Sequence, residues 1–108
     1  MKIKKIDLLY SAPVEDGWRP SFCRIYTDTG LYGDDEVALS YGAVSHAAFA
    51  EMHDLAPLLI GMNPLEHEVI WEKLYRQSFF GLNAGPVIFG AISAFDIALW
   101  DIKGKYYH

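Results

Sequence analysis

The chain has 108 residues, enough for one hydrophobic core but near the lower limit for an enzyme that carries a complete active site. Its formal net charge is -5 and its nine basic residues form no block, so neither nucleic acid nor an anionic membrane is an expected partner. The single cysteine, Cys23, excludes an internal disulfide and indicates a small core residue in a reduced, cytoplasmic protein.

The first residues predict a half-buried strand followed by a surface loop. Apolar and polar side chains alternate over residues 2–10, which places Ile6, Leu8 and Tyr10 on one face. Two prolines and a glycine then interrupt the pattern over residues 11–20, which is typical of a loop.

Residues 21–39 predict two further strands joined by a tight hairpin at Asp28, Thr29 and Gly30. Glycine can take the positive φ that such a turn requires. The economical arrangement of the three strands is an antiparallel meander.

Two helices are expected next, and each has a recognisable boundary. Apolar side chains recur at helical spacing from Ala43, and Pro57 must end or bend this first helix. The second helix is expected to begin with Asn63 as its N-cap and Pro64 at its first position, while Glu66 reaches back to the cap amide. The inward stripe of the second helix is predicted to contain Ile70, Trp71, Leu74, Tyr75 and Ser78.

The last helix, from Pro86 to about Lys105, is apolar on more than one side. Its main ridge at helical spacing is Ile88, Ile92, Phe95, Leu99 and Ile102. Phe89, Ile97 and Trp100 lie off that ridge and are also apolar. The sheet can cover one side of such a helix, but little of the chain remains to cover the other, so a partner outside these residues is expected.

Three alanines and one aspartate of this last helix predict specific contacts. Ala91, Ala94 and Ala98 would let another backbone approach closely. Asp96 lies among apolar neighbours and must be paired or hydrogen-bonded there, with Lys103 as a candidate partner.

Separated segments of the chain resemble one known domain. The hairpin "TDTGLYGDDE", the stretch "LAPLLIGMNPLEHEVIWEKLY" and "AISAFDIALWDIKGK" preceded by "GP" resemble the N-terminal capping domain of the enolase superfamily, in its mandelate racemase and muconate lactonizing enzyme branch. Asp35 stands where that family has a glycine, whereas Glu36 matches the family glutamate. The resemblance implies one α+β domain over residues 1–108, a three-stranded antiparallel β-meander followed by a helical bundle.

The resemblance also implies that the catalytic groups lie outside this chain. Family enzymes abstract the proton α to a carboxylate with lysine or histidine bases, and magnesium stabilises the enediolate. Bases and metal ligands lie on a (β/α) barrel, which is expected to follow His108. No catalytic or metal-binding residue is therefore expected within these 108 residues.

Several functions remain open at this point. The resemblance favours the capping domain of an acid-sugar dehydratase, with racemization or epimerization and cycloisomerization as alternatives within the same superfamily. It also implies three partners, namely the barrel of the same protein, a small carboxylate substrate, and further copies of the enzyme in a homo-oligomer. An alternative of another class is a stand-alone α+β module that binds a protein through the exposed side of the last helix.

Two loops are expected, by resemblance, to close over the mouth of the barrel and shape the substrate pocket. They are Ser11–Pro20 and about Ala38–Ser45. Their candidate substrate-binding residues are Trp18, Arg19, Tyr41 and His46. The aromatic faces suit a polyhydroxylated substrate, and the guanidinium suits a carboxylate. The other histidines, including His53 and His67, show no metal-ligand spacing and are expected to be solvated or part of the core.

Overall fold

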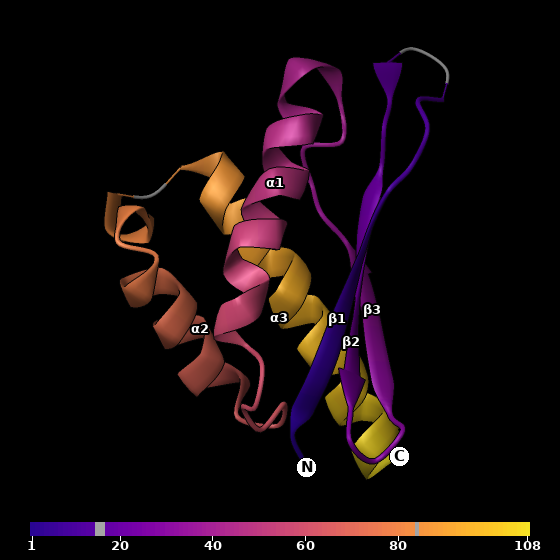
Figure 1. Cartoon of the computed structure of the whole chain (residues 1–108), viewed down its shortest axis with the longest axis vertical. Helices are drawn as coiled ribbons and strands as arrows, with labels where there is room; N and C mark the ends of the chain where they lie inside the picture. Colours follow the sequence, from indigo (N-terminus) through magenta and orange to yellow (C-terminus); the bar gives the residue numbers. More distant parts are fainter. Residues whose placement is uncertain (15–16, 84) are drawn as a thin grey trace.

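The computed structural model describes residues 1–14, 17–83 and 85–108, and it contains a three-stranded antiparallel sheet with helices on one face (Figure 1). The strands are β1 (Ile3–Tyr10), β2 (Ser21–Thr27) and β3 (Tyr32–Glu36), in the order β1-β2-β3. Gly30 has a φ of 91° in the turn between β2 and β3. The predicted meander and its hairpin are therefore confirmed.

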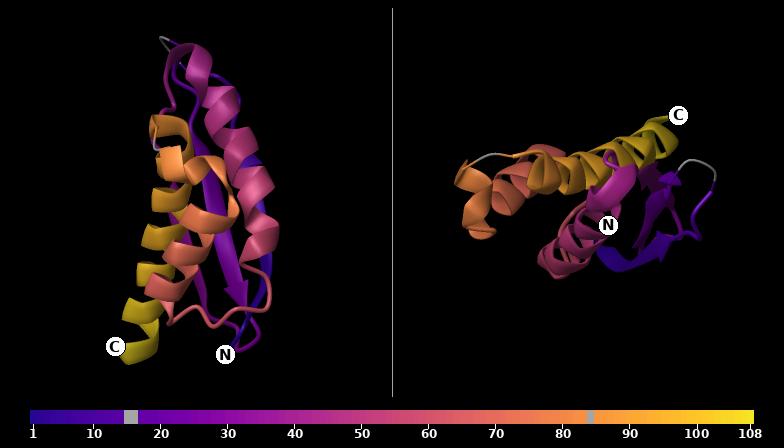
Figure 2. Two further views of the ribbon diagram at one scale, coloured as in Figure 1. Left: turned by 90° about the vertical axis from the view of Figure 1, so that its left-hand side faces the viewer. Right: turned by 90° about the horizontal axis from the view of Figure 1, so that it is seen from above.

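The helices form two layers behind the sheet. Those that follow the strands are η2 (Gly42–Val44), α1 (Ser45–Leu55), η3 (Ala56–Leu58), α2 (His67–Gln77), η4 (Phe80–Asn83) and α3 (Pro86–Tyr107), where η marks a short 3-10 helix. The long helix α3 packs on β2 and β3, and α1 packs on α3 and on β1. The helix α2 packs on α3, on the side away from the sheet (Figure 2).

The α+β fold class follows from the buried faces of these elements. On β2 the alternate residues Cys23 and Ile25 are buried, whereas Phe22 points to the other, uncovered face of the sheet. The main ridge of α3 is buried throughout, as predicted: Ile88, Ile92, Phe95, Leu99 and Ile102. One hydrophobic core thus lies between the sheet and the helices.

The prediction that α2 begins at Asn63 is wrong. The helix begins at His67, and the Asn63 side chain instead accepts a hydrogen bond from the backbone N–H of Leu65 at 3.0 Å. The N–H of Glu66 donates to the carbonyl of Asn63 at 3.1 Å, and the Glu66 side chain caps nothing. An asparagine side chain that bonds two residues ahead closes a local turn, which competes with helix capping.

The apolar side chains off the ridge of α3 have different surroundings. Phe89 is partly buried and lies parallel to the rings of Trp71 and Tyr75 on α2, so the domain itself covers it. Ile97 and Trp100, by contrast, remain 48% and 50% exposed. The unpartnered part of α3 is therefore narrower than predicted, and we call the patch formed by Ile97 and Trp100 the open face of α3.

The expected pairing of Asp96 with Lys103 is wrong. The Lys103 amine donates to Nε2 of His67, 3.2 Å away, and lies over the Trp100 ring. No hydrogen bond to the Asp96 side chain occurs in the described part of the chain, and burial raises the pKa of its carboxyl despite the opposing effect of the nearby His67 ring. His67 is buried against Trp100, so its expected place in the core is confirmed.

No helix among the described residues is both long and apolar enough to span a membrane.

Candidate functional site

The two loops that were predicted to cap a substrate lie side by side at one end of the molecule (Figure 1). Trp18 and Tyr41 form an isolated antiparallel backbone bridge, and the N–H of Arg19 donates to the carbonyl of Ser40 at 2.7 Å. Residues 15 and 16 of the first loop lie outside the described residues. The bridge holds segments that are more than twenty residues apart in a fixed relation, so the side chains of both loops can act on one ligand.

A cleft of about 490 Å³ lies between these loops, the end of β3 and the helix α3. Its lining residues are Trp18, Asp35, Glu36, Val37, Ala38, Leu39, Ser40, Tyr41, Ser93 and Ile97. Trp18 and Tyr41 are 43% and 59% exposed, so their rings are free to contact a ligand. Because Ile97 also belongs to the open face of α3, the cleft is continuous with the apolar surface that lacks a partner in this domain.

The backbone of the second loop adopts conformations that favour glycine. Gly42 has a φ of 66°, and Leu39 has a φ of 71°, which is uncommon for a residue with a bulky side chain. The Leu39 side chain packs beside Gly90 of α3, where a Cβ would lie 3.3 Å from its Cδ1. Packing therefore holds Leu39 in a costly conformation, and such conformations cluster at ligand sites.

The polar part of the cleft is acidic. Burial raises the pKa of the Asp35 carboxyl more than the Glu36 backbone N–H lowers it, and the negative charge of Glu36 raises it further. The Ser40 hydroxyl donates to the carbonyl of Val37 at 3.0 Å and lies 3.5 Å from Oε1 of Glu36. No lining residue in the described part of the chain is basic. The cleft thus presents acceptors for hydroxyl groups and no cation for a carboxylate.

Arg19 and His46 do not line this cleft. The Arg19 Nε–H donates to the carbonyl of Ser11 at 2.7 Å, and its guanidinium lies 3.7 Å from the centre of the Tyr10 ring. His46 lies on the same tyrosine, with ring centroids 5.7 Å apart. These two residues are placed around Tyr10, at the base of the loops, whereas Trp18 and Tyr41 are placed in the cleft.

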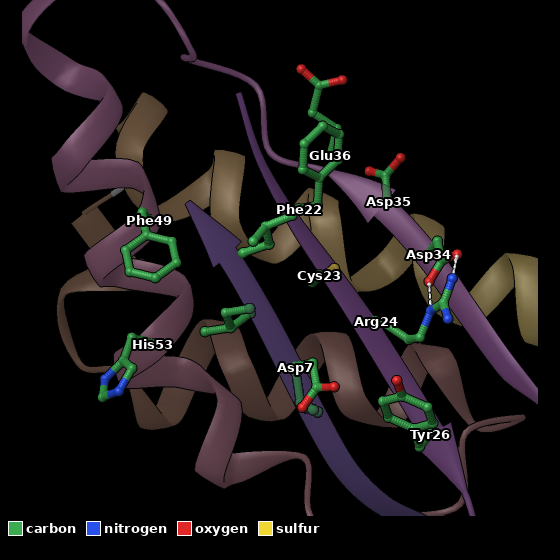
Figure 3. Close-up of a pocket in the computed structure, with 13 residues that line it drawn as sticks. Asp7, Phe22, Cys23, Arg24, Tyr26, Asp34, Asp35, Glu36, Phe49 and His53 are labelled. Carbon is green, nitrogen blue, oxygen red and sulfur yellow. Dashed lines mark hydrogen bonds and ion pairs between the residues drawn. The ribbon is translucent and has the colours of Figure 1, made fainter. Parts of the chain in front are cut away.

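A larger hollow of about 860 Å³ crosses β1 and β2 on the other side of the Asp35 and Glu36 segment (Figure 3). Asp35 and Glu36 line both this hollow and the smaller cleft, and two other charged residues of the hollow, Arg24 and Asp34, pair with each other. Arg24 donates to both carboxylate oxygens of Asp34, at 2.7 and 2.8 Å. Cys23 is buried, and burial raises the pKa of its thiol to about 12, which makes it a poor nucleophile and confirms its place in the core. We therefore take the smaller cleft as the candidate site.

Neither hollow offers a metal site. Within the described ranges, no group of three or more histidine, cysteine, aspartate or glutamate side chains is placed to hold a metal ion. His53 is exposed at the rim of the larger hollow, as expected for a solvated histidine, and His67 is engaged by Lys103. The residues present do not fit a magnesium ion, so any such ion would be held by another part of the protein.

Sequence reasoning identified two of the residues that line the cleft and missed others. Asp35 was singled out only because it departs from the family pattern, and Glu36 only because it matches that pattern. Neither was a candidate for binding substrate, and nothing in the sequence indicated that Ser93 lines the cleft. The sequence marked Ile97 as an apolar residue off the main ridge, and the structure shows it half exposed and lining the cleft.

Known proteins resemble the chain over most of its length. Residues 19–108 match the family model "Mandelate racemase / muconate lactonizing enzyme, N-terminal domain". A D-mannonate dehydratase from Novosphingobium aromaticivorans is 44% identical over 76% of this chain and 20% of its own length. A D-galactonate dehydratase from Pectobacterium atrosepticum is 39% identical over 97% of this chain and 25% of its own length.

A solved structure shows the same fold. The crystal structure of a member of the enolase superfamily from Salmonella Typhimurium superimposes with a TM-score of 0.92 and 42% identity, over 98% of this chain and 27% of that chain. The chain therefore spans about a quarter of the length of the relatives that it matches.

Proposed function

Because the chain belongs to the mandelate racemase / muconate lactonizing enzyme family, as its N-terminal domain, we propose that it caps the active site of a magnesium-dependent acid-sugar dehydratase. The names of the two relatives support the substrate class, since both act on sugar acids with a single carboxylate. The protein is then a cytoplasmic enzyme whose (β/α) barrel follows this domain and which assembles as a homo-oligomer.

The reaction proposed for the whole protein is a β-elimination. A base removes the proton α to the substrate carboxylate, the neighbouring carbon loses its hydroxyl as water, and the enol that forms becomes a keto acid. Magnesium, when bound, supplies the positive charge that stabilises the enediolate. The described residues of this domain do not fit the metal, so the metal ligands and the base are assigned to the barrel.

Within this reaction, the domain binds the substrate and excludes water. Trp18 and Tyr41 present flat faces on which the C–H groups of a sugar can pack, and the hydroxyls of Ser40 and Ser93 line the same cleft. Closing such a surface over the reacting carbon would strengthen electrostatic interactions there and protect the enediolate from solvent.

One observation carries this proposal, namely the backbone bridge between Trp18 and Tyr41. It places two aromatic side chains from separate loops in a single cleft, and that cleft continues into the open face of α3 at Ile97. A barrel that covers the open face would place the mouth of its active site against the cleft. The guanidinium of Arg19 and the ring of His46 are assigned a supporting role beside Tyr10.

The test is an assay of the full-length protein that carries this domain, with magnesium and a panel of acid sugars. The expected result is formation of keto acid from at least one sugar acid, and the Trp18→Ala variant should lower kcat/KM about 10- to 100-fold, because a central aromatic contact is lost.

Phe22→Ala is the matched control, since Phe22 is also an exposed aromatic residue but lines the larger hollow instead. It should leave kcat/KM unchanged. If the protein racemizes or cycloisomerizes its substrate without release of water, the proposed dehydratase activity is wrong and the protein has one of the alternative activities of the superfamily. An inactive protein that captures another protein through the open face of α3 would overturn the capping function altogether.

A further inference from the structure

Asp35 is one of the two carboxylates that line the cleft. It lies in β3 opposite Cys23 of β2, whose side chain is buried. Its side chain is half-buried and lines the cleft together with Trp18 and Tyr41. A carboxylate at this position costs desolvation, so a gain elsewhere is expected to offset that cost.

The cations of the neighbouring elements are all engaged away from Asp35. Arg24 of β2 pairs with Asp34, on the opposite face of β3. On α3, Lys103 donates to His67, and Lys105 donates to Asp101 and to the carbonyl of Tyr32.

The first loop supplies no cation either. The guanidinium of Arg19 is held by the carbonyl of Ser11 and by the Tyr10 ring. The charge nearest to Asp35 within the cleft is the second carboxylate, Glu36. No described side chain in the cleft can therefore neutralise a negative group of a ligand.

We propose that Asp35 makes the cleft select sugar acids with one carboxylate, the aldonates, over sugar acids with a carboxylate at both ends, the aldarates. This selectivity rests on the proposed function. In the proposed function, the carboxylate next to the α-proton would lie with the base in the barrel, so the distal end of the sugar would lie towards this domain. The Asp35 carboxylate accepts hydrogen bonds from the hydroxyls at that end, whereas a second substrate carboxylate would meet two like charges in a partly desolvated cleft.

The test compares an aldonate with the aldarate of the same sugar configuration, D-galactonate and galactarate, in the full-length protein with magnesium. The wild type should have the higher kcat/KM for the aldonate. Asp35→Asn keeps the shape of the side chain but removes its charge, and it should lower the ratio of the two kcat/KM values about tenfold or more, mainly by a gain with the aldarate. Asp35→Gly, which removes the side chain altogether, should lower the ratio in the same direction.

Asp54→Asn is the matched control, because Asp54 is an exposed carboxylate outside the cleft. It lies near the end of α1, whereas the second loop, which lines the cleft, joins the start of that helix. It should leave the ratio unchanged. Where turnover is too slow to measure, the two dissociation constants from calorimetry give the same comparison.

Two results would overturn the selectivity while the proposed function stands. One is a wild type that prefers the aldarate, and the other is a ratio that both Asp35 variants leave unchanged. A wild type that neither converts nor binds any sugar acid would overturn the proposed function, and the selectivity with it.

Discussion

Replacing Gly33 with alanine is expected to lower the free energy of unfolding by about 3 kcal/mol or more, or to prevent folding of the 108-residue chain. Gly33 lies where β3 crosses α3, and a Cβ there would overlap the backbone carbonyl of Ala98 and lie 2.8 Å from Cγ1 of Ile102. A backbone carbonyl inside a helix cannot move aside as the end of a flexible side chain can. The predicted close approach at the small residues of α3 is thus made by the domain's own sheet.

Two hydrogen bonds near Gly33 fix this contact and leave little freedom for relief. Asp101 accepts a hydrogen bond from the backbone N–H of Asp34 at 3.0 Å, and Lys105 donates to the carbonyl of Tyr32 at 2.6 Å. Asp101 and Lys105 also form an ion pair with each other, so the pair ties α3 to the edge of the sheet.

Urea denaturation followed by circular dichroism measures this effect. Gly104→Ala is the control, because nothing lies within 4 Å of a Cβ at Gly104, and alanine should there raise the stability of α3 by up to about 1 kcal/mol. Equal stability of the Gly33→Ala variant and the wild type would show that β3 and α3 do not approach each other as described.

Phe95→Ala is expected to cost about 3 to 5 kcal/mol, since it removes a large side chain from the centre of the core. Phe95 is 0% exposed and lies on the ridge of α3 that faces the sheet and α1. The neighbouring helices cannot close the cavity without moving α3 off β3, where Gly33 already fixes the distance.

The same denaturation experiment, with Ile97→Ala as the control, compares the loss of unfolding free energy on the buried side of α3 with that on its exposed side. Ile97 is half exposed in the domain alone, so its truncation should cost less than about 1 kcal/mol there. A loss for Phe95→Ala no greater than that for Ile97→Ala would contradict the assignment of the buried ridge.

Most strands and helices could be predicted from the sequence, because the periodic spacing of apolar side chains is a local property of the chain. Alternation predicted β1, and the spacing from Ile88 to Ile102 predicted the buried side of α3. The start of α2 was misplaced because Asn63 can cap a helix or close a turn, and the choice depends on the packing of the segment around it. The neighbours of Phe89 were missed for the same reason, since the position of α2 beside α3 is a tertiary property.

The candidate site was predictable only in part. Trp18 and Tyr41 could be chosen by residue type, but the bridge between them joins two loops whose relation no local pattern encodes. Arg19 follows Trp18 directly in the sequence, yet its side chain is directed to Tyr10, because the Tyr10 ring and the Ser11 carbonyl satisfy its charge and its N–H group. Asp35 became a candidate only once the structure placed it among groups that cannot neutralise it.

Hydroxyl-radical footprinting of Trp100, in the 108-residue chain and in the full-length protein, measures whether a barrel covers the open face of α3. If the open face of α3 docks on a catalytic barrel, Trp100 should be oxidised readily in the domain alone, where it is 50% exposed, and protected in the full-length protein. Trp71, which is packed between α2 and α3, serves as the internal reference and should react equally in both. Equal oxidation of Trp100 in both forms would contradict a docked barrel and the capping function that depends on it.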